Sequence, residues 1–223
     1  FTIVVRGCCD ADGNPLSNDD ALAEVRRIQS EMEASLGANR FPNWIGPQRF
    51  GSGRPVTPVV GRHAVNEDWK EAVMAYLGME GKSEEEEAQY VRKYIRENGV
   101  DESLLDKLPR WMGFERRMIE HLLAHPEDYT GAFRKLPANL QLMTIHALQS
   151  IVFNKSLHRR LEAGLPLSTP VVGDIVGRID EKGQLDVKSC VTVEPRTLSR
   201  ISRNCDIGRL TPTGPLPGSD IST

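Results

Sequence analysis

Hydrophobic residues recur at helical spacing through most of this chain and alternate like strands only near its end. The first helical pattern predicts a helix that is capped by Ser17 or Asn18 and stops at Gly37. Its apolar positions are Leu22, Val25, Ile28, Met32 and Leu36. Ahead of it, the β-branched run from Thr2 to Arg6 predicts a short strand. A strand and a helix are therefore expected to lead into residues 37–62.

The middle of the chain predicts several more helices, separated by proline and glycine. Residues 65–77 predict an amphipathic helix. Its buried face is expected to hold Trp69, Val73 and Leu77. Residues 139–163 predict the longest helix, which stops at Gly164. Its apolar stripe is expected to consist of Leu142, Ile145, Leu148, Val152 and Leu161.

Between these two helices lies an acidic run followed by shorter helical patterns. The four acids of residues 84–87 are interpreted as the solvated start of a helix, near its positive dipole end. A divalent-ion site is the alternative, but the region supplies no further ligands. Residues 101–134 predict two or three short helices, with Trp111 and Phe114 in the core. His121 and His125 have a spacing that could bind zinc, but no third ligand is evident, so no metal site is predicted.

From Thr169 onward the pattern changes to strands. Residues 171–172, 175–176 and 185–193 predict strands around the turn signal Asp180-Glu181-Lys182-Gly183, which indicates a hairpin. The chain is therefore expected to be an α+β protein that ends in a small, mostly antiparallel sheet. A short helix is also predicted after the hairpin, in an acid-free stretch from Pro195 to Asn204.

Length and composition limit the class of protein. The 223 residues, 39% hydrophobic and 26% charged, are typical of an ordinary globular protein with one large domain or two modest ones. No apolar run could span a bilayer, so no membrane association is expected. Cys8, Cys9, Cys190 and Cys205 are interpreted as reduced and mostly buried, which favours an intracellular, cytoplasmic protein. A strand-like start without Met indicates a piece of a longer chain.

The charge pattern is most unusual in residues 37–62. This segment holds four arginines and three aromatic residues but no acid, although the whole chain has a formal net charge of -3. Glycine and proline every few residues exclude a helix there. Arginine forms paired hydrogen bonds with phosphate, and aromatic rings stack on unpaired bases, so the segment predicts a site for RNA or another phosphate-bearing ligand. The alternative is a loop whose arginine stems simply cover apolar surface.

Cations elsewhere could extend such a surface. Arg196, Arg200 and Arg203 recur along the predicted C-terminal helix and are either solvent-exposed or a second stripe for RNA phosphates. The candidate RNA-binding residues are Arg40, Arg54, Arg62, Lys155, Arg159, Arg196, Arg200 and Arg203.

Four sequence blocks give these observations a more specific meaning. Asn43-Trp44-Ile45-Gly46-Pro47-Gln48-Arg49-Phe50-Gly51 resembles the motif loop of the TruD family of tRNA pseudouridine synthases. His146-Ala147-Leu148-Gln149-Ser150-Ile151-Val152-Phe153-Asn154 is similar to a helix of that family. The opening Phe1–Arg6 and the segment Pro212–Gly218 resemble its first strand and a later turn. The spacing of the middle blocks looks archaeal or eukaryotic rather than bacterial.

The resemblance implies an isomerase that converts a uridine of tRNA, expected at position 13, to pseudouridine. It implies tRNA as partner and no metal or organic cofactor, and we expect a monomer. The expected active-site loop residues are Asn43, Trp44, Ile45, Gln48, Arg49 and Phe50. In these roles Asn43 positions the catalytic aspartate or the uracil edge, while Gln48, Arg49 and Phe50 brace the loop, with an internal ion pair favoured for Arg49.

This sequence departs from the family pattern at two points. The family's catalytic aspartate lies in a Gly-x-Lys-Asp block, and none of the aspartates here follows that pattern. The aspartate is therefore expected upstream of this chain, which alone should be inactive. Ile45 stands where the family commonly has Phe, the residue expected to stack on the target uracil. Stacking at this position is therefore in question, although Trp44 could compensate.

The resemblance also predicts a domain division. Residues 1–62 are expected to belong to the catalytic domain, and residues 63–223 to an inserted domain that is helical over 63–164 and strand-rich over 165–223. The alternative function is a catalytically inactive RNA-binding or protein-interaction module on the same scaffold. A third reading is an unrelated α+β domain with a coincidental loop. A Gly-x-Lys-Asp block upstream in the gene would favour the enzyme.

Overall fold

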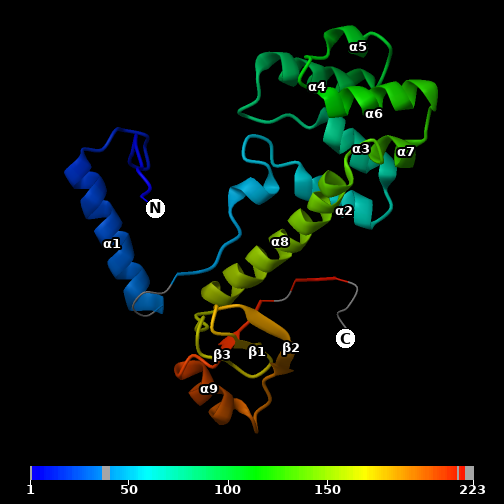
Figure 1. Cartoon of the computed structure of the whole chain (residues 1–223). Coiled ribbons are helices and arrows are strands. Elements are labelled where there is room, and N and C mark those ends of the chain that lie inside the picture. The colour runs from blue at the N-terminus through cyan, green and yellow to red at the C-terminus, as the bar shows by residue number, and fades with distance from the viewer. Residues whose placement is uncertain (1, 37–40, 215, 219–223) are drawn as a thin grey trace. The chain divides into compact units, whose positions relative to one another are not determined.

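A computed structural model describes residues 2–36, 41–214 and 216–218 (Figure 1). Its contacts divide the chain into two compact units. One combines the N-terminal segment up to Asn43 with Arg160–Thr213, and the other holds Trp44–Arg159 with the segment that begins at Gly214. The predicted domain boundary at residue 62 stays a prediction, because compact units and inherited domains need not coincide. Among the described helices, none is both long and apolar enough for a membrane span.

The unit that begins at Trp44 is helical (Figure 1). Its elements are the 3-10 helix η1 (Pro47–Phe50) and the helices α2 (Thr57–Val65), α3 (Trp69–Gly78), α4 (Glu86–Asn98), α5 (Leu104–Lys107), α6 (Gly113–Ala124), α7 (Tyr129–Phe133) and α8 (Ala138–Glu162). Aliphatic side chains from α2 to α6 are completely enclosed in one core, among them Val60, Leu77, Ile95, Leu104 and Ile119. Each such side chain contributes about 1.5–3 kcal/mol to folding.

The helix predicted over residues 65–77 is in fact the end of one helix and most of another. α2 ends at Val65, Glu67 takes a positive φ of 61° in the turn, and α3 begins at Trp69. The predicted buried face is confirmed, since Val73 and Leu77 are completely enclosed and Trp69 packs against the core.

The prediction that residues 37–62 contain no helix is wrong, because α2 begins at Thr57. Pro58 lies in its first turn, where a missing N–H costs no hydrogen bond. Gly61 faces α8, and a Cβ atom at this position would overlap the carbonyl of Thr144. The proline and the glycine therefore serve the start and the packing of a helix.

The long helix is confirmed as α8, and Gly164 follows it with a φ of 65°. Its buried face, however, differs from the predicted stripe. Leu142 and Val152 are exposed, whereas the small residues Thr144, Ala147 and Ser150 are buried. Small side chains let neighbouring backbones approach α8 closely, and hydrophobic periodicity alone does not reveal such a face.

The N-terminal helix is confirmed as α1 (Asn18–Leu36). The backbone N–H of Asp20 donates to Ser17 Oγ, and this hydroxyl donates back to the Asp20 carboxylate, so Ser17 caps the helix. The strand predicted from Thr2 to Arg6 does not form. Ile3, Val4 and Val5 are exposed, and within the described ranges no strand pairs with them, which a strand requires to satisfy its backbone.

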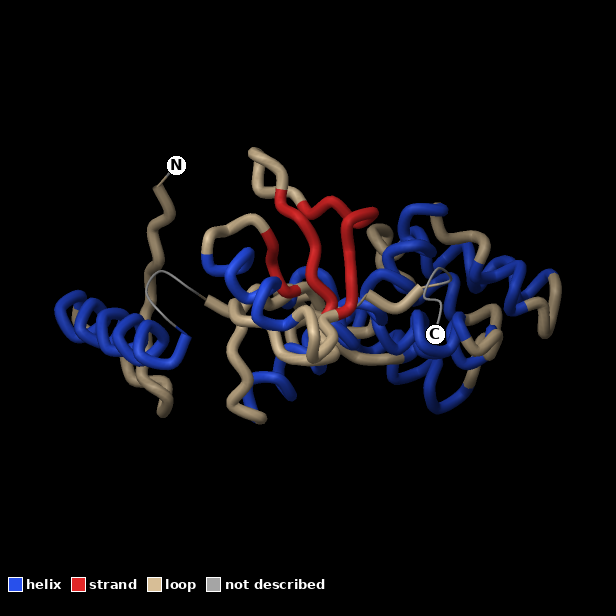
Figure 2. The backbone as a smooth tube through the Cα atoms, turned by 90° about the horizontal axis from the view of Figure 1, so that it is seen from below, coloured by secondary structure: helices blue, strands red, loops and turns tan. Residues whose placement is uncertain are grey.

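Three antiparallel strands form the sheet, which appears in red in Figure 2: β1 (Ile175–Ile179), β2 (Leu185–Thr192) and β3 (Leu210–Pro212). Their order is β2-β1-β3, and the predicted hairpin is β1–β2. Helix α9 (Leu198–Asp206) packs on the sheet through Ile201, which shares a small core with Val176 and Val193. The predicted α+β class with a small antiparallel sheet is thus confirmed, although residues 171–172 form no strand and β3 was not predicted.

Several side chains predicted to be buried are not. Trp111 is 57% exposed, while Phe114 packs against the core as predicted. None of the four cysteines is buried: Cys9 is exposed, and Cys8, Cys190 and Cys205 are half-buried. These residue types often lie inside proteins, but the short segments around them leave one side open to solvent.

Candidate functional site

The motif loop, defined as residues 43–51, is shaped by its glycines and proline. Gly46 and Pro47 lead into the single turn of η1, and Gly51 ends it with a φ of 93°. A Cβ atom at Gly51 would overlap the carbonyl of Arg54, so only glycine is accommodated there. The loop is therefore a turn of defined shape.

Asn154 of α8 fixes this loop by its side-chain amide. The N–H of Ile45 donates to Asn154 Oδ1 at 3.0 Å, and Asn154 Nδ2 donates to the Ile45 carbonyl at 2.9 Å. The two hydrogen bonds satisfy both backbone groups of a half-buried residue. The first and second motif blocks thus meet at this pair.

The later block, residues 212–218, reaches the same helix. Gln149 Nε2 donates to the Pro217 carbonyl at 2.5 Å. Gly214 lies against the ring of Phe153, with no room for a side chain. The block on α8, residues 146–154, therefore contacts both the motif loop and the block of residues 212–218.

The exposed side chains of the loop are those that could contact a ligand. Asn43, Trp44, Gln48 and Arg49 are exposed, and Phe50, like Ile45, is half-buried. The Trp44 ring lies 6.4 Å from the ring of His158, which flanks it on α8. Arg49 has no ion-pair partner among the residues that the structure describes, so the internal ion pair favoured for it does not form.

Arg54 instead has the internal role. Its side chain is only 12% exposed, lies near Glu84 and Glu115 at 3.8 and 3.7 Å, and donates to the Tyr76 carbonyl. Its guanidinium also stands over the Tyr76 ring, 5.4 Å from the centroid. Arg54 thus has a structural role, and the contact with RNA predicted for it stays a prediction.

The two glutamates bind Arg92 more tightly than Arg54. Arg92 is 2% exposed, and its guanidinium donates to Glu84 at 2.8 Å and to Glu115 at 3.0 Å. A third bond reaches the Leu77 carbonyl at 3.1 Å. Two arginines and two glutamates thus form a neutral buried cluster, which joins the segment after the motif loop to α3, α4 and α6. The interpretation of Glu84 as solvated is wrong, while Glu85, Glu86 and Glu87 are exposed.

Burial shifts the pKa values of Arg54 and of the neighbouring Tyr76. Loss of solvent, together with the charge of Arg92, lowers the pKa of Arg54 to about 10, so Arg54 still carries its charge at neutral pH. Burial, with the charge of Glu115, raises the pKa of Tyr76 to about 12 and keeps its phenol neutral. Arg54 and Tyr76 therefore each keep one charge state around neutral pH.

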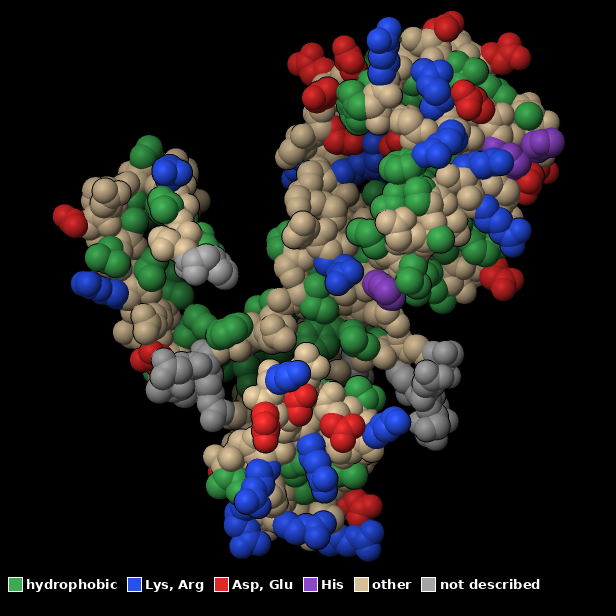
Figure 3. Space-filling view, in the orientation of Figure 1, with side chains coloured by type: hydrophobic (Ala, Val, Ile, Leu, Met, Phe, Trp, Pro, Cys, Tyr) green, Lys and Arg blue, Asp and Glu red, His purple; other side chains and the backbone are tan. Residues whose placement is uncertain are grey.

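The other predicted cations have different surroundings. Arg62, Lys155 and Arg159 are exposed, and the last two lie on α8 beside Asn154 and His158. Arg200 and Arg203 are exposed on α9, whereas Arg196 precedes that helix and pairs with Glu194 at 2.5 Å. Arg40 lies outside the described residues. Figure 3 shows Lys and Arg side chains gathered over α9 on the face in view.

No metal site is apparent in the part of the chain that the structure describes, where no group of three or more suitable side chains comes together. His121 Nε2 lies 2.8 Å from Asp128 Oδ2, and the same carboxylate accepts the Gly131 N–H at its other oxygen. The pair thus closes the turn before α7.

Sequence patterns predicted the motif loop but missed the buried cluster. Arg92 lies eight residues after Glu84, on a helix whose charged composition suggests a solvated surface. One signal was present: Arg92 shares a helix face with Ala88 and Ile95, both completely buried.

Comparison with known proteins agrees with the four blocks. The family model described as tRNA pseudouridine synthase D (TruD) matches residues 1–223. The "Probable tRNA pseudouridine synthase D" of Methanosarcina mazei is 38% identical over 202 residues, covering 91% of this chain and 45% of that protein. The protein of the same description from Methanopyrus kandleri is 42% identical over 154 residues, which cover 69% of this chain and 38% of that protein.

A solved structure supports the same relationship. The crystal structure of a TruD protein from Methanosarcina mazei superposes with a TM-score of 0.81 at 38% identity, covering 91% of this chain and 46% of that one. This chain thus spans less than half the length of these relatives. The archaeal resemblance is confirmed, and a coincidental likeness of one loop is excluded. The chain belongs to the tRNA pseudouridine synthase D (TruD) family.

Proposed function

We propose that this chain is the part of a tRNA pseudouridine synthase that presents the motif loop to its substrate. The observation that carries the proposal is the pinned loop, whose backbone is fixed by Asn154 while Asn43, Trp44, Gln48 and Arg49 face solvent. An enzyme that modifies a base must take it out of its stack and hold it among rings, amides and cations. The exposed side chains supply each of these groups.

The reaction is an isomerisation of uridine, which we place at position 13 of tRNA. The bond from N1 of uracil to C1′ of the ribose breaks, the base rotates, and a bond from C5 to C1′ forms. N1 gains a hydrogen and C5 loses one, so the atoms balance without a co-reactant. A catalytic aspartate acts on the sugar as base or nucleophile. We assign that aspartate to polypeptide outside these 223 residues.

The loop residues have distinct roles in this proposal. The Asn43 amide holds the uracil edge or the aspartate. Trp44 stacks on the base, because its ring is exposed, whereas Ile45 is half-buried and has both backbone groups engaged. Arg49 binds a phosphate beside the base. Gln48 and Phe50 brace the turn.

Other cations extend the contact with tRNA. Arg62, Lys155 and Arg159 are exposed in the unit that contains residues 44–51 of the loop. The remaining cations predicted from the sequence are Arg40, Arg54, Arg196, Arg200 and Arg203. The protein needs no organic cofactor or metal in this scheme, works as a monomer and acts in the cytoplasm.

Binding of unmodified tRNA to the 223-residue chain tests the role of the loop. Arg49→Gln should weaken binding and reduce the slope of log Kobs against log salt by about 1, because one phosphate contact is lost. Arg110→Gln is the matched control, an exposed arginine outside the motif blocks. Equal affinities and slopes for the two variants would reject the phosphate contact.

Turnover distinguishes the enzyme from the inactive module on the same scaffold. The chain alone should leave uridine in tRNA unmodified, and the full reading frame should produce pseudouridine. Pseudouridine from the chain alone would show that the aspartate is misassigned. A full-length protein that binds tRNA without turnover would support the binding module instead.

A further inference from the structure

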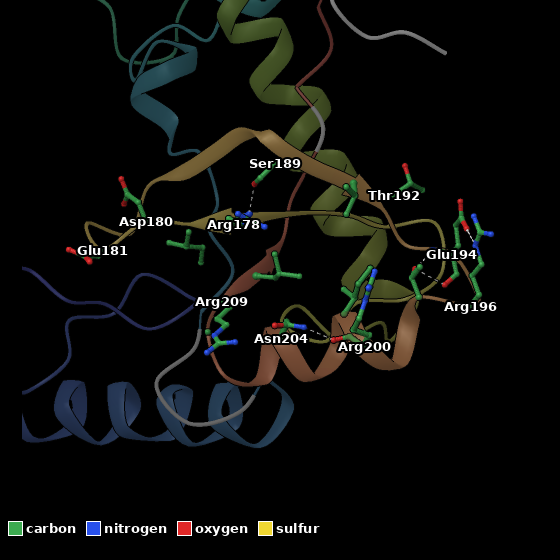
Figure 4. A pocket seen from close by; sticks show the side chains of 16 residues that line it. Arg178, Asp180, Glu181, Ser189, Thr192, Glu194, Arg196, Arg200, Asn204 and Arg209 are labelled. Carbon is green, nitrogen blue, oxygen red and sulfur yellow. Dashed lines mark hydrogen bonds and ion pairs between the residues drawn. The ribbon is translucent and has the colours of Figure 1, made fainter.

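A groove lies between the sheet and α9, in the unit that contains Arg160–Thr213. Its volume is about 910 Å³, which is in the range of sites for drug-sized ligands. A single phosphate ion would fill only a small part of it. Ile179, Val191, Ile201 and Leu210 contribute apolar surface. Figure 4 shows its polar side chains, which come from β1, β2, α9, the turn between the two strands and the segments before α9 and β3.

Three arginines in this groove have no side-chain partner in the part of the chain that the structure describes. Arg178 on β1, Arg200 on α9 and Arg209 before β3 are exposed, and their guanidinium groups form no ion pair or hydrogen bond among the described residues. They project from three different elements, so the sheet and the helix together fix their arrangement. Five N–H donors on each guanidinium are therefore available to a ligand.

The carboxylates of the groove are placed differently. Glu194 is bound by Arg196 at 2.5 Å. Asp180 accepts the backbone N–H groups of Lys182 and Gln184 in the hairpin turn. In the view of Figure 4, Asp180 and Glu181 lie at one end, Glu194 at the other, and the three unpaired arginines between them.

This arrangement selects for a ligand with several separated negative charges. Four arginines and three acids line the groove, so its net charge is only slightly positive, and what favours an anion is the central position of the unpaired cations. The apolar side chains that line the groove offer a surface for sugar and base faces.

We propose that this groove binds a short single-stranded segment of the tRNA, with Arg178, Arg200 and Arg209 on successive phosphates. The proposal rests on the proposed function, which makes RNA the ligand, and it assigns Arg178 and Arg209, which sequence patterns did not single out. It excludes Arg196, which is bound to Glu194. Arg203 lies on the same helix but does not line the groove.

The test compares two triple variants of the whole 223-residue chain. Arg178→Gln, Arg200→Gln and Arg209→Gln remove the unpaired groove cations. Arg110→Gln, Arg134→Gln and Lys182→Gln remove the same charge from exposed positions outside the groove. The probes are unmodified tRNA, a single-stranded oligouridylate, an acidic peptide of equal charge and inorganic phosphate. Circular dichroism verifies that both variants fold.

The groove variant should lose most of its affinity for the oligouridylate, and its salt slope should fall by about 2, from three contacts on a single strand. The control variant should keep most of the wild-type affinity for the oligouridylate and most of the wild-type salt slope. In the wild type, the oligouridylate should shift the amide NMR signals of Ser189 and Asn204, which line the groove.

Other outcomes overturn the proposal. Equal losses in the two variants, or amide shifts confined to other regions, would mean that the groove is not the site. Preference for the acidic peptide would identify a protein partner, and equal binding of inorganic phosphate would identify an isolated anion site. If wild type binds tRNA and the groove variant binds equally well, the groove proposal fails while the proposed function stands. If wild type binds no tRNA, the proposed function itself fails.

Discussion

Asn154 holds Ile45 at both its backbone N–H and its carbonyl, across a separation of 109 residues. Two hydrogen bonds to one residue fix its orientation as well as its position. Because Ile45 lies between the exposed Trp44 and the turn of η1, this contact determines where the neighbouring side chains point.

Removing this amide should loosen the loop. Asn154→Ala is expected to lower the free energy of unfolding by about 1–3 kcal/mol, because two backbone groups lose their partners. It should also weaken tRNA binding. Urea titration and equilibrium binding measure the two effects. Ser156→Ala is the control, since among the described residues Ser156 Oγ bonds only the Val152 carbonyl of its own helix. Equal stability of the two variants would refute the role of Asn154.

Close packing of α2 on α8 can be tested at Gly61. Gly61→Ala should destabilise the protein by about 1–3 kcal/mol, because the added methyl group would overlap the Thr144 carbonyl and push the helices apart. Gly113→Ala, at the start of α6, has open space and should be neutral or stabilising by up to about 1 kcal/mol. Thermal unfolding of both variants checks the contrast, and a neutral Gly61→Ala would contradict this packing.

The buried cluster should depend strongly on Arg92. Arg92→Ala would leave both glutamates with the longer contacts of Arg54, and Glu84 would keep only the Gly81 N–H beside it among the described residues. We therefore expect a loss of about 3–5 kcal/mol in the free energy of unfolding. Arg96, on the same helix, pairs with Glu80 at 2.7 Å but is 56% exposed. Arg96→Ala should therefore cost at most about 1 kcal/mol. Denaturant unfolding that gave similar losses for both would argue against a structural role of the cluster.

Acid should selectively remove the contribution of the ionised Asp128 side chain to the free energy of unfolding. The Gly131 N–H, followed by the His121 side chain, lowers the pKa of this carboxylate below 3.8. Because its folded-state pKa is depressed, the ionised form adds stability above the unfolded value of 3.8, and this is lost as the pH falls through the folded-state pKa.

The stability difference between wild type and Asp128→Asn should therefore shrink between about pH 6 and about pH 2. Thermal unfolding across this range measures it. Asp106→Asn is the control, since Asp106 is exposed and has no hydrogen bond or ion pair among the described residues. A difference for Asp128→Asn that stays constant with pH would contradict the assignment.

Local sequence signals predicted the elements that local forces determine. Ser17 caps α1, Gly164 follows α8, and the turn at Asp180–Gly183 joins β1 to β2, as expected from each residue's own preferences. The strand expected at Thr2–Arg6 failed because a strand needs a partner, which its own residues cannot supply. β3 was missed because three residues give too short an alternation to recognise.

The site was predictable only in part, for the same reason. The sequence of the motif loop identified its family, but nothing in the local sequence shows that Arg49 is exposed and Arg54 is buried. Their difference depends on Glu84 and Glu115, which are brought to Arg54 by the folding of α4 and α6. The charge of a side chain can be read from a sequence, whereas its burial depends on residues far away.

The spacing of contacts along α8 limits how this protein can change in evolution. Gln149, Phe153 and Asn154 reach their partners from one rigid rod, on which each added residue turns everything beyond it by about 100°. An insertion or deletion between Gln149 and Asn154 would direct one of these contacts to the wrong side. Substitutions can therefore accumulate on this helix, whereas insertions and deletions between Gln149 and Asn154 cannot.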